Sequence, residues 1–166
     1  MNNSNQKKIE SIILYILQHF QNRLSVEDFY KILYSANKYF LANFGKSIYP
    51  DKFYADENGP IPVITQKKQT ELIDFNVFSK SISIEKDVII AKQKPNTDYL
   101  SKMECIYLDK YCIDNNIEYK DSAYDLALLR GKTDPTKRHM TIIEIAKAGG
   151  ASEKMISYIE EIELFF

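Results

Sequence analysis

One helix is signalled more strongly than any other element of this sequence, between Ser25 and Gly45. Ser25 has the side chain of a helix N-cap, and Asp28 follows three residues later, as in a variant of the capping box. The next apolar side chains recur every three or four residues and so share one helical face: Phe29, Ile32, Leu33, Ala36 and Phe40. Gly45 can take the left-handed conformation that ends many helices. The sequence therefore predicts a long amphipathic helix against which the rest of the chain must pack.

Short motifs follow one another in a fixed order through and beyond this helix. They are Lys-Ile-Leu-Tyr at 31–34, Phe-Gly at 44–45, Ile48, Asp-Lys-Phe-Tyr-Ala at 51–55 and Asn-Gly-Pro-Ile at 58–61. In this order and spacing they resemble the signature of the Panacea domain family of SocA-like antitoxins, and a fainter similarity extends over residues 9–165. Ile32 and Ile61 stand where Leu or Val is expected, which are mild changes. The resemblance implies a mostly helical domain, bacterial or prophage-associated, that neutralises a toxin or adapts it for proteolysis.

A single domain spanning residues 1–166 is expected, since this length buries about two-thirds of the unfolded surface. The 45% hydrophobic and 27% charged residues are typical of a globular protein. The net charge of −1 gives no overall field that would attract nucleic acid or an anionic membrane. The longest apolar run, at 12–17, is far too short to span a bilayer, and the polar first eight residues do not resemble a signal peptide. We therefore expect a cytoplasmic protein.

The remaining pattern predicts an α+β fold that is predominantly α-helical, a compact helical domain with a small antiparallel β-hairpin. Alternation of Ile with Ser and a second β-branched run place the hairpin between residues 76 and 92. We expect it to pack on the helices or to pair with an extended segment at 47–54. Ser101 and Glu104 form a capping box for one helix. Helices are expected at 6–20, at 65–73 after Pro62, at 101–115, at 121–129, at 141–148 and at 152–164.

Metal, cofactor and catalytic sites are not predicted. His19 and His139 are the two histidines, and neither has a cysteine or carboxylate at ligand spacing. Cys105 and Cys112 are too far apart on one helix to form a disulfide, and we expect both on its buried face with Ile106, Tyr107 and Tyr111. No histidine lies near them in sequence to activate a thiol. We expect no enzyme; a hydrolase in which the fold brings a cysteine to His139 is a third hypothesis.

Residues 141–164 have the spacing of a helix-turn-helix, with Ala146, Gly150 and Ile156 as the small, turn and locking residues. The second helix would then read the DNA major groove. It carries four glutamates and one lysine, however, and phosphates repel such a surface. A packing corner is therefore favoured, and a DNA-binding transcriptional regulator is the alternative. A nearby basic set is either a solvated loop or a docking place for an acidic group: Arg130, Lys132, Lys137, Arg138 and His139.

A protein partner is the main functional prediction. The turn at 58–60 needs its Gly and Pro for structural reasons, and beside aromatic residues it would also make a rigid docking ridge. The predicted partner-binding residues are Tyr34, Tyr54, Asn58, Gly59 and Pro60. The apolar end, residues 164–166, either covers the edge of the core or stays exposed for a partner. With the resemblance, these features predict a non-catalytic interaction domain whose partner is a toxin encoded nearby.

Overall fold

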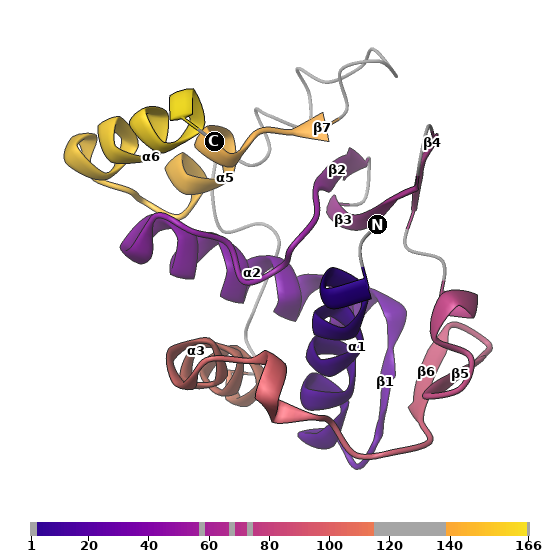
Figure 1. Cartoon of the computed structure of the whole chain (residues 1–166). Coiled ribbons are helices and arrows are strands. Elements are labelled where there is room, and N and C mark those ends of the chain that lie inside the picture. The colour runs from indigo at the N-terminus through magenta and orange to yellow at the C-terminus, as the bar shows by residue number, and fades with distance from the viewer. Residues whose placement is uncertain (1–2, 57–58, 67–68, 73–74, 115–138, 166) are drawn as a thin grey trace.

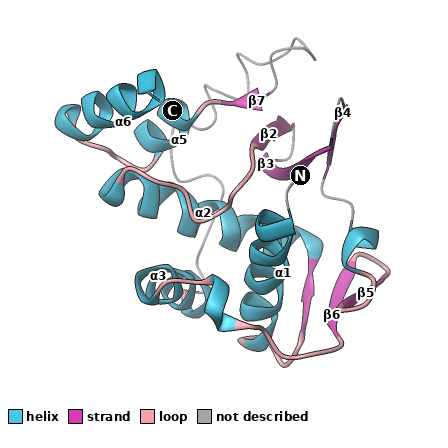
Figure 2. Cartoon of the chain, viewed as in Figure 1, coloured by secondary structure: helices cyan, strands magenta, loops and turns pink. Residues whose placement is uncertain are grey.

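The computed structural model describes residues 3–56, 59–66, 69–72, 75–114 and 139–165. Its helices and strands follow in the order α1 (Asn3–Gln18), β1 (Arg23–Ser25), α2 (Val26–Phe44), β2 (Phe53–Asp56), β3 (Gly59–Gln66), β4 (Gln69–Leu72), β5 (Ile82–Glu85), β6 (Val88–Ala91), α3 (Lys102–Ile113), β7 (His139–Met140), α5 (Ile142–Ala148) and α6 (Glu153–Phe165). The predicted α+β fold, dominated by helices, is confirmed (Figure 2). Within the described ranges no helix is both long and apolar enough to cross a membrane.

Helix α2 lies at the centre of the molecule, with α3 on one side and the α5–α6 pair on the other (Figure 1). Its predicted ends are confirmed. The Ser25 hydroxyl accepts a hydrogen bond from the Asp28 backbone N–H at 3.1 Å, and Gly45 ends the helix at φ 74°. Phe29 and Leu33 are fully buried. Since burying a large apolar side chain stabilises a fold by about 1.5–3 kcal/mol, α2 contributes much of the core.

Helix α1 buries an unbroken aliphatic stripe beside a three-stranded sheet of order β1-β6-β5. The side chains of the stripe are all 0% exposed: Ile9, Ile12, Ile13, Ile16 and Leu17. The predicted hairpin is confirmed as β5 and β6, antiparallel with Ile84 opposite Ile89. Its third strand is β1, the link between α1 and α2, and not the segment at 47–54. A two-stranded hairpin is marginal in water, and this nearby link supplies the missing neighbour.

A second sheet has the order β4-β3-β2-β7, and it corrects the prediction of a helix at 65–73. Those residues form the β3–β4 hairpin, in which Val63 stands opposite Leu72. The β-branched run at 63–65 favours an extended backbone. Pro62 stands opposite Phe53 in the part of β3 that pairs only with β2. A proline is tolerated there because its missing N–H interrupts no second ladder.

Helices α3, α5 and α6 form where the sequence predicts them, but the buried face of α3 differs from the predicted one. In α3 the Ser101–Glu104 capping box is confirmed, with hydrogen bonds of 2.8 and 3.1 Å. Ile106, expected to be buried, is 46% exposed, whereas Leu108 is fully buried, because α3 presents its Leu108 side to the core. The helices predicted at 141–148 and 152–164 are confirmed as α5 and α6. The helix predicted at 121–129 lies outside the described residues.

Candidate partner-binding surface

The loop at 45–52, between α2 and β2, is held by one buried amide side chain. Asn37 is 1% exposed, and its Oδ1 accepts hydrogen bonds from the backbone N–H groups of Ile48 at 2.8 Å and Tyr49 at 3.0 Å. An amide oxygen has two lone pairs, so this geometry uses its full accepting capacity. The loop therefore has a fixed conformation relative to α2.

Aromatic rings form the base beneath this loop. The Tyr49 and Phe53 ring centroids are 5.2 Å apart, and the Tyr34 ring meets Phe53 edge-on at 5.5 Å. The Tyr49 hydroxyl donates to the Val63 carbonyl at 2.8 Å, which ties the loop to β3. Burial, with a smaller contribution from the Asp51 charge, raises the pKa of Tyr49 well above its ordinary value. Tyr49 therefore remains a neutral hydrogen-bond donor, and the base of the loop is rigid and apolar.

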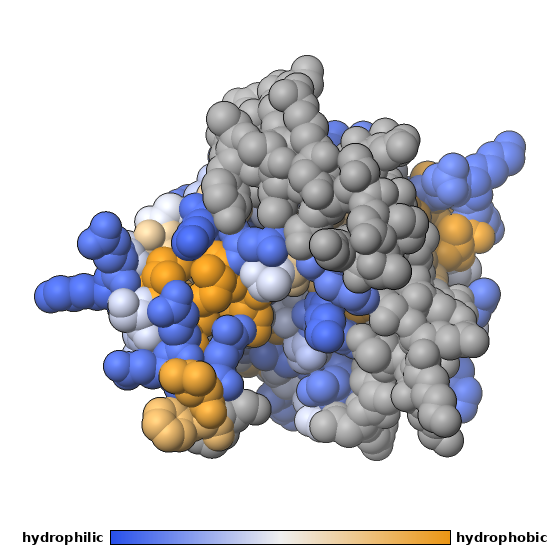
Figure 3. Space-filling model, turned by 90° about the horizontal axis from the view of Figure 1, so that it is seen from above, coloured by the Kyte–Doolittle hydropathy of each residue, from blue (hydrophilic) through white to orange (hydrophobic). Residues whose placement is uncertain are grey.

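An open groove of about 660 Å³ lies between this loop, β7 and the α5–α6 pair, and we call it the α5–α6 groove. Its apolar lining comes from four elements and the loop: Tyr49, Phe53, Met140, Ile142, Ile145 and Ile162. Ile145 is 3% exposed, whereas Ile142 is 40% exposed. Figure 3 shows a hydrophobic area on this side of the molecule, with hydrophilic residues beside it. Apolar surface of this kind, rimmed by polar groups, is typical of an interaction site.

The α5–α6 pair is fixed on α2 at two glycines. A Cβ atom on Gly149 would stand 2.3 Å from the Lys38 carbonyl oxygen, so only glycine allows this approach. A Cβ atom on Gly45 would stand 2.6 Å from the Tyr158 ring. Gly150 takes the turn at φ 82°, and Ala146 is fully buried, which agrees with the packing role given to both residues. The pair therefore forms a firm wall of the α5–α6 groove.

The predicted partner-binding residues lie at different depths. Tyr34 is 1% exposed, so it supports the surface from beneath and its side chain is not part of that surface. Tyr54 is half-buried on β2, with its ring 4.8 Å from that of His139 on β7. Gly59, at φ 130°, and Pro60 are buried, and they are the first residues of β3, opposite Asp56 and Ala55, where a turn was predicted. Asn58 lies outside the described residues.

The residues that the sequence analysis missed are the aliphatic ones of β7, α5 and α6. Met140, Ile142 and Ile162 were given no binding role from the sequence, whereas the structure places them with the loop at 45–52 around the α5–α6 groove. The available signal was a surplus of isoleucine in residues 142–162, beyond what a helical corner must bury. Of the predicted basic set, His139 lies in the part of the chain that the structure describes, and it lines this groove.

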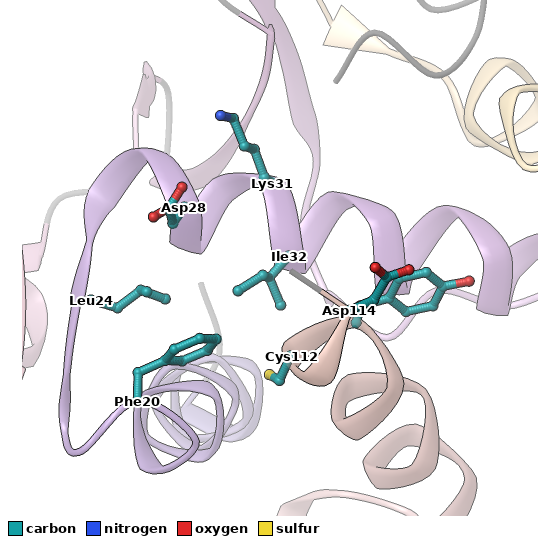
Figure 4. Close-up of a pocket in the computed structure, with 8 residues that line it drawn as sticks. Phe20, Leu24, Asp28, Lys31, Ile32, Cys112 and Asp114 are labelled. Atoms are coloured by element: carbon teal, nitrogen blue, oxygen red, sulfur yellow. The ribbon is translucent and has the colours of Figure 1, made fainter. Parts of the chain in front are cut away.

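A second cavity, of about 110 Å³, lies between the start of α2 and the end of α3 (Figure 4). Leu24, Ile32 and Cys112 face it, with Asp28 and Lys31 at its edge. Burial, with a smaller contribution from the Asp109 charge, raises the pKa of Cys112 to about 12. A thiol that remains protonated at neutral pH is a poor nucleophile. The described residues that line this pocket include no activated nucleophile.

Other polar contacts join helices without forming a reactive site. Asp109 on α3 accepts a hydrogen bond from the Tyr15 hydroxyl at 2.6 Å and lies 2.8 Å from His19 Nε2 on α1. Burial raises the pKa of the adjacent Cys105 thiol. Helix α3 and β7 lie on opposite sides of α2 in Figure 1, which separates both cysteines from His139. Among the described residues, no group of three or more His, Cys, Asp or Glu side chains is placed to hold a metal ion.

Comparison with known proteins assigns part of the chain to a family, and that part does not include β7, α5 or α6. The model of the family described as "Antitoxin SocA-like, Panacea domain" matches residues 29–126. These residues include α2 from Phe29 onward, the loop at 45–52, strands β2 to β6 and α3. The comparisons with curated proteins and with solved structures found no match.

Proposed function

The chain belongs to the SocA-like antitoxin family with a Panacea domain, and from this membership we propose that it is a non-catalytic antitoxin or proteolytic adaptor. Its partner is a toxin protein, encoded close to its own gene in a bacterial or prophage module. The partner binds in the cytoplasm through surface contact, and no cofactor takes part. The family match supports a role of the toxin–antitoxin type in general, and the finer assignment is ours.

The α5–α6 groove is the observation that carries the proposed binding mode. It combines a rigid base, held by Asn37 and Tyr49, with exposed aliphatic side chains such as Ile142. Interfaces gain affinity from apolar anchors that enter preformed pockets, since little ordering entropy is then lost. Tyr54 extends the proposed surface at the β7 end, and the buried Gly59 and Pro60 at the start of β3 keep that edge in place.

Co-expression tests the proposal. The neighbouring open reading frame is expressed alone and together with this chain, and growth and co-purification are measured. The expected result is toxicity of the neighbour alone, with rescue and co-purification when both are present. Ile142→Ser should weaken the co-purification at least tenfold, whereas Ile106→Ser should leave it unchanged. The two isoleucines are 40% and 46% exposed and lie on different helices. A harmless neighbour that does not co-purify would overturn the antitoxin assignment.

The alternative function is DNA binding by the α5–α6 pair, and it is supported by the positive φ of Gly150 in the turn and by the full burial of Ala146. Three features of the pair oppose it. Helix α5 has only 7 residues, α6 carries four glutamates against one lysine, and both helices pack on α2. Phosphate contacts need cationic side chains. Salt-sensitive binding of a promoter fragment, lost on charge substitution in α6, would favour this alternative.

A further inference from the structure

We infer that α6 and the adjoining groove bind a cationic amphipathic helix of the partner protein, an inference that rests on the proposed function. Four side chains at spacings of three and four residues lie along one face of α6: Met155, Tyr158, Ile162 and Phe165. We call them the α6 strip. Residues at this spacing face the same side of a helix, so the α6 strip presents one continuous apolar line.

The two ends of the α6 strip differ in burial. Met155 and Tyr158 pack over Gly45, and Ile162 lines the α5–α6 groove. Phe165, at the other end, is 80% exposed, and the adjacent Leu164 is 81% exposed. Phe165 therefore does not cover the edge of the core, which was one of the two interpretations of this segment. The α6 strip starts on firmly packed structure and ends as exposed apolar surface.

Acidic side chains stand beside the exposed end: Glu161 is three residues from Tyr158 and four from Phe165, Glu163 lines the groove, and Glu160 lies on the far face of α6. Glu160, Glu161 and Glu163 are exposed on α6, and the last turn of the helix contains no basic residue. The C-terminal end of a helix carries the negative pole of its dipole, and these carboxylates add further negative charge there. This end of α6 therefore attracts cations. Lysine or arginine side chains of a partner would supply that positive charge. The opposite rim of the groove carries Lys46 and Lys52 with Asp51 and is net positive, so the basic side chains of a partner helix would lie on the α6 side.

This combination selects one class of occupant. A nucleic acid or an anionic lipid surface would bring phosphates against the glutamates, which repel them. A second copy of this chain would bring its own acidic helix end against the first. A helix with apolar side chains on one face and lysine or arginine beside them satisfies both the α6 strip and the carboxylates. Helix-in-groove recognition of this type uses anchors at spacings of three and four residues.

The test uses the full chain and two synthetic amphipathic helices of about 14 residues, or four turns. One is built from leucine and lysine, and the other from leucine and glutamate in the same order. NMR chemical-shift mapping should place the lysine peptide on α6 and the groove, whereas the glutamate peptide should not bind. Shifts scattered over the surface, or equal binding of both peptides, would overturn the inference.

Two pairs of variants locate the contact. Phe165→Ser should weaken binding of the lysine peptide at least tenfold, whereas Ile113→Ser, at a 71% exposed position on α3, should not change it. Glu161→Lys should weaken binding of the lysine peptide and make that binding less sensitive to salt. Glu85→Lys on β5 should change neither. All four positions are exposed, and unchanged melting temperatures would show intact folds.

Growth rescue separates this inference from the proposed function. If the chain neutralises its partner and the α6 variants bind that partner as well as wild type does, only the α6 assignment fails. If the lysine peptide binds α6 but no toxic neighbour is bound or neutralised, the antitoxin role fails and α6 remains a site for cationic helices.

Discussion

Gly45 lies directly against Tyr158, so close that a Cβ atom on this glycine would stand 2.6 Å from the ring carbon Cε1. The same glycine ends α2 at φ 74°, a conformation that other residues rarely adopt. Gly45→Ala therefore meets both backbone strain and overpacking, and should lower the free energy of unfolding by about 2–4 kcal/mol. Urea denaturation measures this loss.

Gly150→Ala is the matched control, because Gly150 also has a positive φ of 82° but has nothing within 4 Å of an added Cβ. Gly150→Ala should lower the free energy of unfolding only by the backbone strain, about 1 kcal/mol. Equal losses for the two variants would mean that the contact with Tyr158 does not constrain the helix end.

Asn37→Ala should release the loop at 45–52 while leaving the core in place. The backbone N–H groups of Ile48 and Tyr49 lose their shared acceptor, and each unsatisfied buried group costs about 1–3 kcal/mol. Hydrogen exchange of these two amides should accelerate at least tenfold, whereas that of the Ile12 amide in α1 should change less. Asn43→Ala is the control on the same helix, since Asn43 is exposed and donates to Tyr39 and Tyr107. Similar acceleration in both variants would refute the role of Asn37.

Glu104 performs two tasks, and two substitutions separate them. Its carboxylate pairs with Lys8 at 2.6 Å and accepts the Ser101 backbone N–H at 2.8 Å, while the residue is 5% exposed. Glu104→Gln keeps an acceptor for the cap and should cost about 1–2 kcal/mol, whereas Glu104→Ala loses both bonds and should cost about 3 kcal/mol. Glu27→Ala, which removes the exposed pair with Lys31, should cost below about 0.5 kcal/mol. Thermal unfolding would reveal this order, and equal losses for Gln and Ala at 104 would contradict it.

Alkaline pH should destabilise the fold, starting with Cys112. Its pKa is 9.0 in ordinary surroundings and about 12 in the folded chain, because burial disfavours the thiolate. The buried thiol makes its full contribution to the free energy of unfolding below pH 9. This contribution is lost as the pH rises towards 12, because unfolding then releases a proton. The slope is about 1.4 kcal/mol per pH unit for one group. Tyr30 and Tyr111, whose pKa values burial raises from 10.0 to about 12, add to the loss above pH 10.

Cys112→Ala should make the free energy of unfolding fall less steeply between pH 9 and 10. This holds whatever stability the substitution costs at neutral pH. Urea midpoints at pH 8 and 10 give the comparison. The difference in free energy of unfolding between wild type and variant should shrink by about 1 kcal/mol over this interval. A constant difference would show that the thiol does not titrate differently in the folded and unfolded chain.

Local signals in the sequence were enough to predict where the helices end and where the β5–β6 hairpin lies. Ser25, Gly45 and the Ser101–Glu104 box act through neighbouring backbone groups, so their effect can be predicted without the rest of the fold. The β3–β4 hairpin could not be predicted in the same way. Its short apolar run fits either a helix or a strand, and only pairing with β2 decides between them.

The binding surface was harder to predict than the fold. Helix α2 is buried through seven consecutive residues, 32–38, although this run includes Asn37 and Lys38. Tyr34 was predicted to bind a partner, and the burial of this whole run places its side chain beneath the surface. The α5–α6 groove joins the loop at 45–52 to residues 139–163, and no local pattern records contact across such a separation.

The contact between Gly149 and the Lys38 carbonyl also bears on synthesis of the chain. Helix α2 leaves the ribosome before α5 and α6, which cover one of its sides and are made about a hundred residues later. At about 5–20 residues per second, the side of α2 around Lys38 and Ala42 remains uncovered for about 5–20 seconds of translation. The nascent chain must therefore keep this apolar side from aggregating until its last helices emerge.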